Sequence, residues 1–526
     1  MNEMMSRGEY YTTMLDRLKA LPNEILHAHP HFAVSYAWLL SITLQLDEVE
    51  PRLKEVEKIS GENLSAEIRL EILVIRAFLA RQRKDFAKST ELSLKALSTL
   101  PENPYDDNPL QREVRTGIVF NLGYIHLLGK GDATEAEKWF SKAISISEAA
   151  SSITLILGAM DGISHCRILQ GKLYQAAETY RKGMQLAGKY EQQRGQEIPA
   201  ASYASIGLGN ILREQNKLDE AFYHLSHGID MSHRWQIGDV LCKGYMYQAR
   251  LKQAQGDIDG ALESIRQAEQ LPYTYRIVPI YGGPIAACRM HLLLMKGMSE
   301  NGEFDPSYLD EIQKWADDQG FRLNGPINSL EDEYEYLVWA RLLLAQNENE
   351  KSSQLLAHLL EAAEDRGRTE RVIEILILQA LALQSLIGEE VSLKTLKRAL
   401  LLAEPEGYIR LFVDEGRPME RLLQRAESYN YSPGYVSQLL EAFEKETAQM
   451  QSSPQSSAFR LIDPLSDREI EVLHLLMKDL SGLKIADKLF ISLNTVKTHI
   501  KNIYSKLNVH SRSEAVELAK KLHLIS

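Results

Sequence analysis

Apolar residues along the first 448 positions follow the spacing of one helix face, with three or four residues between successive apolar side chains. Prolines and glycines fall between these apolar runs rather than inside them. No sustained alternation of apolar and polar residues favours β-strands. The pattern therefore predicts an all-α fold for this part of the chain.

One local pattern repeats within this region. A turn pair is followed, five residues after its first member, by an alanine, and the four alanines lie 40, 45 and 40 residues apart. Weaker copies surround Lys84-Asp85 and Gln346-Asn347. The four clear copies are Gly131-Asp132 with Ala136, Gly171-Lys172 with Ala176, Asn216-Lys217 with Ala221, and Gly256-Asp257 with Ala261.

Each copy is typical of two helices joined by a tight turn. One such hairpin cannot bury its apolar face, whereas stacked hairpins share a continuous core. Small residues such as Gly123, Gly162 and Gly207 allow neighbouring helices to approach closely. We therefore expect residues 1–448 to form an α-solenoid of eight or nine hairpins. It resembles the tetratricopeptide repeat (TPR), although its period is longer; the alternative is an irregular helical array.

Residues 449–461 are rich in serine and glutamine and predict a flexible linker. They separate the solenoid from a C-terminal domain, residues 462–526, in which four helices are predicted. Ser466 and Ser511 each head a capping box with a glutamate three residues later. A short second helix follows Ser481, and the third covers about 493–507.

The third predicted helix has two chemically different faces. At 100° per residue its apolar residues share one side, and the opposite side carries no acidic residue. Such a face suits the major groove of DNA, because phosphates repel carboxylates while Thr, Asn and Lys can hydrogen-bond to base edges. The apolar set is Val496, Ile500, Ile503 and Leu507; the polar set is Asn494, Thr498, Lys501 and Ser505, with Lys497 at its flank.

Charge is distributed unevenly along the chain. The net charge is −12 overall, −14 over residues 1–460 and +2 over residues 461–526, and it reaches +5 from Leu480 onward. DNA binding by this modest basic region is expected to depend on dimerisation and on salt. One hypothesis is that the acidic solenoid covers the basic helix until an effector binds.

The C-terminal domain resembles the LuxR/NarL/FixJ family of helix-turn-helix DNA-binding domains over about 55 residues. It departs from the usual Asn-Lys-Glu of that family at Gly482-Leu483-Lys484, which puts one phosphate contact in doubt. The matching residues are Leu465-Ser466, Arg468-Glu469, Glu471-Val472-Leu473, Leu480-Ser481, Ile485-Ala486, Leu489, Ser492, Thr495-Val496-Lys497-Thr498-His499, Ile503, Lys506-Leu507, Val509, Ser511-Arg512 and Ala515-Val516.

The resemblance implies a role for particular residues of this chain. Lys497, Thr498 and Lys501 would read bases in the major groove. Ser481, Asn494, Thr495, Lys506 and Arg512 would position the phosphate backbone; the alternative for Lys506 and Arg512 is that they are ordinary surface charges. Val516, Ala519 and Leu522 would form a homodimer contact.

A solenoid followed by this kind of domain resembles the MalT-like regulators. The opening RGEYYTTMLDRLKALPNEILHAHPHFAVSYAWLL and the segment from Glu404 to Gln424 resemble the two ends of the repeat region in that family. The family also carries an N-terminal P-loop ATPase, but this chain has no G-x-x-x-x-G-K-[ST] sequence, so ATP binding is not expected. By this resemblance the chain would begin where that module ends, as a fragment, as a truncated gene product or as a family member without the module.

In that family the solenoid acts as a sensor of an inducer or a partner protein. Trp235, Tyr273, Tyr275 and Tyr281 are candidates for a ligand-facing surface. The alternative is that these aromatic side chains fill the interfaces between helices.

The sequence thus predicts a cytoplasmic, sequence-specific DNA-binding transcription regulator, an activator by resemblance, with no cofactor. Its expected partners are double-stranded DNA, RNA polymerase and a small inducer or protein. The alternative is a TPR-like interaction scaffold with a vestigial DNA-binding module. Catalytic and metal-binding motifs are absent, as are a signal peptide and an 18-residue apolar run, and we expect Cys166, Cys242 and Cys288 to be packed as free thiols.

Overall fold

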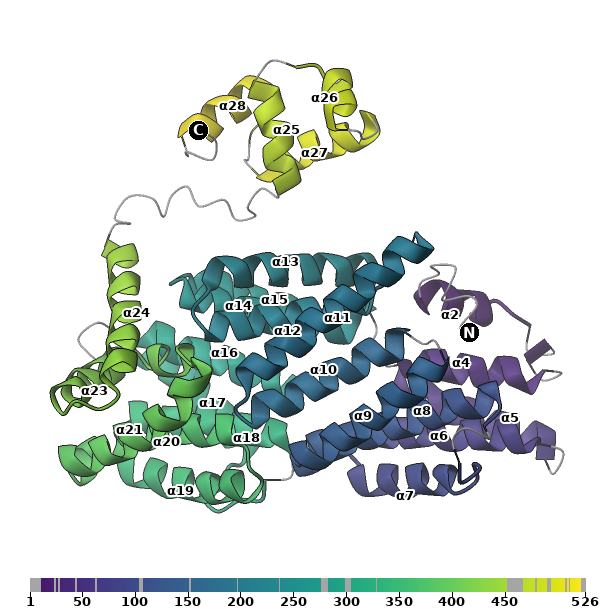
Figure 1. The fold of residues 1–526 in the computed structure, drawn as a ribbon, viewed down its shortest axis with the longest axis horizontal. Helices are drawn as coiled ribbons and strands as arrows, with labels where there is room; N and C mark the ends of the chain where they lie inside the picture. Colours follow the sequence, from purple (N-terminus) through teal and green to yellow (C-terminus); the bar gives the residue numbers. More distant parts are fainter. Residues whose placement is uncertain are drawn as a thin grey trace. The chain divides into compact units, whose positions relative to one another are not determined.

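The computed structural model describes most of the chain as two compact units, residues 1–444 and 445–526. The helices of both units are drawn in Figure 1. The residues it describes run from 11 to 521 with gaps at 23–24, 27–28, 43–44, 62–63, 104–106, 151–152, 196, 236, 276–281, 299–303, 328, 452–466, 478–479, 490–492, 507–508 and 510.

The first unit is built from helical hairpins, as the repeat predicts. Within the described residues a single bridge, between Met298 and Phe304, is the only β-type pairing. After α2 (Tyr11–Lys19), the described residues form nine successive helix pairs, which agrees with the predicted eight or nine hairpins. The pairs are α4 (Pro30–Ile42) with α5 (Leu46–Ser60), α6 (Ala66–Gln82) with α7 (Phe86–Leu97), α8 (Pro109–Tyr124) with α9 (Ala133–Ala150), α10 (Ile153–Leu169) with α11 (Leu173–Arg194), α12 (Ala201–Glu214) with α13 (Leu218–Trp235), α14 (Gly238–Ala254) with α15 (Ile258–Tyr275), α16 (Gly282–Gly297) with α17 (Pro306–Gln319), α18 (Leu330–Ala345) with α19 (Asn349–Asp365), and α20 (Thr369–Leu386) with α21 (Glu389–Ala403).

Five further elements of the described chain follow or extend the pairs, and the last of them, α24, continues past the end of the first unit at Glu444. The π-helix η3 (Ile125–Lys130) extends α8, and the 3-10 helix η4 (Glu404–Glu406) follows α21. α22 (Arg410–Val413), α23 (Gly416–Ser428) and α24 (Pro433–Gln451) end the series. Because α24 continues to Gln451, the prediction that the linker begins at residue 449 is wrong; Gln and Met are good helix formers and prolong the helix.

The turns of the repeat share one backbone geometry. Each predicted turn contains a residue with positive φ, between +58° and +78°, at Gly131, Gly171, Asn216 and Gly256. The two weaker copies have the same feature at Lys84 and Asn347, each with φ of 60°. The next backbone N–H bonds to a carbonyl five residues earlier, as in Lys172 to Arg167 (2.8 Å), which is the pattern that ends a helix.

The residue five positions after each turn is packed against the first helix of its hairpin. The four repeat alanines are fully buried, with 0% of their surface exposed. In the weaker copies a serine takes this position, and the hydroxyls of Ser89 and Ser352 donate to the carbonyls of Ala77 (2.6 Å) and Ala340 (3.1 Å). Ser392 does the same toward Ala380, which marks a further copy that the alanine pattern did not reveal.

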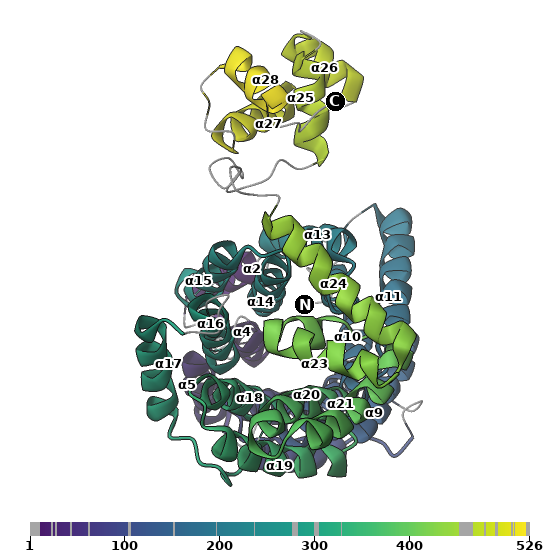
Figure 2. The same ribbon diagram turned by 90° about the vertical axis from the view of Figure 1, so that its left-hand side faces the viewer.

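The hairpins of this unit follow one another around a ring (Figure 2). Helices distant in sequence therefore pack together: η3 contacts α18, α10 contacts α20, and α12 contacts α22. The first helices of consecutive hairpins also pack side by side, from α10 to α20. We call the face shared by α10, α12, α14, α16, α18 and α20 the inner face. It carries the polar groups described below.

Candidate DNA-binding helix and the inner face of the solenoid

After α24, the described residues of the C-terminal unit form the four predicted helices around one apolar core. They are α25 (Asp467–Met477), α26 (Gly482–Leu489), α27 (Leu493–Lys506) and α28 (Arg512–Lys521). The predicted apolar side of α27 is confirmed where it is described, because Val496 and Ile503 are fully buried and Ile500 packs against the same core. Leu507 lies outside the described residues.

The opposite side of α27 presents lysines to solvent. Lys497 and Lys501 lie one helical turn apart and are both exposed, whereas His499 is partly buried. This arrangement leaves two positive charges free to meet phosphates or base edges. The side chains of Asn494, Thr495, Thr498 and Lys506 lie outside the described part of the chain.

Two serines act at helix starts. Ser511 accepts the backbone N–H of Glu514 (3.3 Å) and donates to its carboxylate (2.7 Å), which confirms the predicted cap of α28. Ser481 is exposed and accepts the N–H of Lys484 at 3.5 Å. A phosphate could approach Ser481 from solvent; that contact stays a prediction.

Arg512 has a structural contact that the sequence does not reveal. Its guanidinium donates to the backbone carbonyl of Leu476 and so ties α28 to the last turn of α25. Arg512 is therefore more than an ordinary surface charge, whether or not it also contacts phosphate. Of the predicted dimer contacts, Val516 is partly buried, and the side chains of Ala519 and Leu522 are not described.

The candidate aromatic surface is not assembled among the described residues. Tyr273 is 86% exposed and fills no helix interface. Trp235 is partly buried and donates its indole N–H to Glu197 at 2.7 Å. Tyr281 and the side chain of Tyr275 lie outside the described residues, so a ligand surface here stays a prediction.

The inner face instead gathers ionisable side chains, and most of them are paired. Arg341 bonds to Glu374 (2.9 Å) and to Glu415 (2.5 Å), and Arg371 bonds to Glu374 (2.6 Å). Although burial raises the pKa of Glu374, the nearby arginines hold it at about 2, so this carboxylate stays ionised. These pairs link α18, α20 and the segment after α22.

A second inner group surrounds Asp161 on α10. Its carboxylate accepts the Tyr180 hydroxyl (3.0 Å) and Lys243 (3.4 Å), and His165 lies at 3.5 Å. Burial lowers the pKa of His165 to about 4, so the imidazole is neutral near pH 7. Asp161 is 3% exposed, and its partners hold its pKa below the ordinary value although burial opposes this.

The contact between α12 and α22 joins two parts of the solenoid almost 200 residues apart. Glu214 accepts the backbone N–H of Leu411 through Oε1 (2.8 Å) and that of Ile409 through its own carbonyl (3.0 Å). Its Oε2 accepts Arg213 at 2.7 Å. We call this contact the α12–α22 interface.

Arginine and aspartate side chains complete the α12–α22 interface. Arg213 (1% exposed) reaches Asp414 at 3.4 Å, and Arg410 (2% exposed) bonds to the same aspartate. Burial raises the pKa of Asp414, but the two arginines outweigh it and keep the carboxylate ionised. Arg410 also donates to Asn216 at 3.3 Å.

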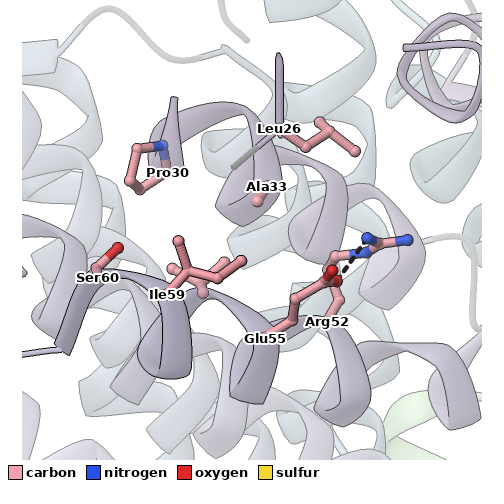
Figure 3. Close-up of a pocket in the computed structure, with 8 residues that line it drawn as sticks. Leu26, Pro30, Ala33, Arg52, Glu55, Ile59 and Ser60 are labelled. Carbon is pink, nitrogen blue, oxygen red and sulfur yellow. Dashed lines mark hydrogen bonds and ion pairs between the residues drawn. The ribbon is translucent and has the colours of Figure 1, made fainter. Parts of the chain in front are cut away.

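A small surface hollow lies elsewhere, between α4 and α5. Figure 3 shows the Arg52–Glu55 ion pair at its rim, with N and O atoms 2.7 Å apart. It holds about 240 Å³ of empty space and is otherwise lined mostly by apolar side chains, including Leu26, Pro30 and Ile59. Much of this space is open solvent, and the part that compares with a ligand pocket is about 10 Å³, so this hollow is a weak candidate for an effector site.

Two other kinds of feature are not found in the part of the chain that the structure describes. None of its helices combines the length and apolar composition needed to cross a bilayer. No group of three or more His, Cys, Asp or Glu side chains there could hold a metal ion. The three cysteines are buried, as expected.

Comparison with known families gives two matches along the chain. Residues 71–429 match the MalT-like TPR region, and residues 463–519 match the bacterial regulatory proteins of the luxR family. The HTH-type transcriptional regulator MalT of Yersinia pestis (strain Pestoides F) is 24% identical over 525 residues and aligns with 96% of this chain. The Vibrio parahaemolyticus regulator of the same name is 25% identical over 544 residues, which cover 99% of this chain.

The chain spans little more than half of those relatives, 55% of the Yersinia protein and 57% of the Vibrio protein. Among solved structures, a Rap protein complexed with competence and sporulation factor aligns with 79% of this chain and 98% of its own, with a TM-score of 0.39 and 11% identity. A STAND protein with a tetratricopeptide repeat sensor from Pyrococcus horikoshii aligns with 78% of this chain and 57% of its own, with a TM-score of 0.35 and 13% identity.

Sequence reasoning missed the inner face and the α12–α22 interface. The one available signal was the segment from Glu404 to Gln424, whose resemblance marked the end of the repeats without showing its partner. Its Tyr408, Arg410 and Asp414 pack against α10 and α12. Ion pairs between residues so far apart leave no periodic trace in a single sequence.

Proposed function

This chain belongs to the MalT-like TPR family, and on that premise we propose that it is a DNA-binding transcription regulator whose solenoid senses an effector. The observation that carries the proposal is the pair of exposed lysines, Lys497 and Lys501, on the helix of the luxR-type domain opposite its buried side. An element built this way can enter the major groove, with its apolar side held by the other helices.

The domain acts on DNA in the cytoplasm as a homodimer, with α28 as the contact. Its modest positive charge makes two half-sites necessary for useful affinity at physiological salt. By analogy with the regulators it resembles, it activates transcription through RNA polymerase. The base-reading set is Lys497, Thr498 and Lys501, and the phosphate set is Ser481, Asn494, Thr495, Lys506 and Arg512.

The solenoid supplies the regulation. Its inner face brings polar groups from six hairpins together, and the α12–α22 interface joins that face to the segment that leads into α24. An effector that changes this interface changes the end of the solenoid nearest the DNA-binding domain in sequence. The effector is a small molecule or a protein partner.

DNA binding by the full chain tests the proposal. Fluorescence anisotropy with labelled fragments from upstream of its own gene should show specific binding that weakens steeply between about 50 and 200 mM salt. A scrambled fragment of the same length is the matched control. Equal affinity for both fragments, or no binding at low salt, would favour the interaction scaffold instead.

A further inference from the structure

Arg250 on α14 stands out on the inner face because its guanidinium forms no hydrogen bond or ion pair with any described residue. It is partly exposed, although burial is the largest influence on its pKa. The carboxylates of Asp414, Glu214 and Glu374, together with the Tyr334 hydroxyl, outweigh burial and keep it charged. Arg250 is therefore a positively charged side chain that is only partly exposed to solvent.

The neighbouring charges are already engaged with one another. Glu214 and Asp414 pair with Arg213 and Arg410 in the α12–α22 interface. Glu374 and Glu415 pair with arginines of α18 and α20. We call the whole set the inner charge cluster; it consists of Arg213, Glu214, Arg250, Arg341, Glu370, Arg371, Glu374, Arg410, Asp414 and Glu415.

Glu370 on α20 is the second member of this cluster without a hydrogen bond or ion pair to any described residue. Burial raises the pKa of Glu370 to about 7, against the opposing effect of Arg371. Near neutral pH, about half of the molecules therefore carry a protonated Glu370. When Glu370 is protonated, the five arginines of the cluster outnumber its four other carboxyl groups by one.

Other polar groups surround the same place. Tyr247 on α14, His291 on α16 and Tyr334 on α18 are partly exposed and interact electrostatically with Arg250. Burial lowers the pKa of His291 to about 3, so its imidazole is neutral and can donate or accept a hydrogen bond. These three side chains thus offer hydrogen bonds beside the Arg250 guanidinium.

We propose that Arg250 binds the oxyanion, a carboxylate or a phosphate, of a small effector on the inner face of the solenoid. The guanidinium fork matches two oxygens of either group, and a partly enclosed site strengthens the charge-assisted bonds. Glu370, Tyr247 and His291 hydrogen-bond to the rest of the effector. This inference rests on the sensor role proposed above and names the chemical class of the effector.

The site lies beside the α12–α22 interface, and this gives the effector a way to act. Arg250 interacts electrostatically with Glu214 and Asp414, which hold that interface together. An anion on Arg250 weakens this attraction and changes the balance of charge around Asp414. Occupancy is therefore communicated to α22 and the helices that follow it.

Thermal unfolding of the full chain tests the proposal with inorganic phosphate and with succinate, each at 20 mM and at matched ionic strength. Occupancy of the site should raise the Tm of the wild type by about 2 °C. The neutral succinamide should have no effect. In Arg250→Met the shift should disappear, whereas Arg266→Met, which removes an exposed arginine from the neighbouring helix α15, should leave it unchanged.

Several outcomes decide the matter. A Tm shift with phosphate alone assigns a phosphorylated effector, and a Tm shift with succinate alone assigns a carboxylate effector. Shifts with both ligands support one site that accepts either group. No shift, or an equal shift in Arg250→Met, overturns the proposal, because general salting effects act on both proteins. If Arg250→Met does not fold, Arg250→Lys replaces it and should show less than half of the wild-type Tm shift. A Tm shift as large as that of the wild type would overturn the proposal. DNA anisotropy, measured separately, shows whether the regulator proposal survives such a failure.

Discussion

The Glu214 carboxylate accepts the backbone N–H of Leu411 at 2.8 Å, although the two residues are 197 positions apart. The same residue accepts Ile409 through its backbone carbonyl and Arg213 through its other carboxylate oxygen. Three donors from two distant segments thus converge on one buried residue. Glu214 thus connects α12 to the segment that contains α22.

We expect Glu214→Ala to lower the stability of the solenoid by about 3–5 kcal/mol, because it leaves the Leu411 N–H buried without its acceptor and removes the nearer of the two carboxylates that pair with Arg213. Urea unfolding followed by circular dichroism measures this. The exposed Glu220, on α13, provides the control, and Glu220→Ala should change stability by less than about 0.5 kcal/mol. Similar losses for both variants would contradict the role given to Glu214.

Gly207 faces the ring of Tyr180, and a Cβ at this position would lie 2.1 Å from the Tyr180 Cζ. Gly207→Ala should therefore displace a fully buried tyrosine and cost about 1–3 kcal/mol. A Cβ on Gly183, in the helix that carries Tyr180, would meet its nearest neighbour at 3.5 Å, which is ordinary contact. Gly183→Ala should therefore keep or slightly raise the Tm; a lower Tm than for Gly207→Ala would refute this reading.

Lys497→Ala and Lys501→Ala should each weaken binding to the specific DNA fragment by about 1–3 kcal/mol if these lysines read bases. Loss of phosphate contacts would instead weaken specific and scrambled DNA equally and reduce the salt dependence. Anisotropy titrations at several salt concentrations separate the two. Lys351→Ala, an exposed lysine of α19, is the charge-matched control; unchanged affinity in the Lys497/Lys501 double variant would exclude this face.

Arg512→Met should destabilise the C-terminal unit by about 1–2 kcal/mol, because the Leu476 carbonyl loses its charged donor. Hydrogen exchange of α25 and α28 in the full chain measures this locally, and both helices should lose protection. A purely phosphate-binding Arg512 would weaken DNA binding and leave exchange unchanged.

The stability of the solenoid should depend on the protonation of Glu370. Burial raises its folded-state pKa to about 7, so its contribution is complete below about pH 4.5 and is lost as pH rises through 7. Glu370→Gln stays neutral at every pH. From pH 5 to pH 8 the variant should therefore gain stability relative to the wild type, on the order of 1–3 kcal/mol.

Tm values at four pH points between 5 and 8 test this. The exposed Glu350 gives the matched control, for Glu350→Gln should follow the wild-type curve at all four points. Parallel curves for Glu370→Gln and the wild type would mean that Glu370 is ionised in the folded state throughout this range.

The two domains and the helical faces could be predicted because they depend on short stretches of chain. The turn residues at Gly131, Gly171, Asn216 and Gly256 all adopt the positive φ that their type and position indicate. The buried side of α27 was visible in the three- and four-residue spacing of Val496, Ile500 and Ile503. Local composition misplaced the end of α24, since a helix can continue through a polar segment.

The sequence by itself determined that this protein is a helical-repeat solenoid followed by a DNA-binding type of helix-turn-helix domain, because periodicity, caps and turns act over a few residues. Only the tertiary structure decided which hairpins meet. Small rotations between successive hairpins add up around the ring, and their sum brings α12 to α22 and α10 to α20. This arrangement of the hairpins pairs Arg213 with Asp414. It also leaves Arg250 without a partner among the described residues.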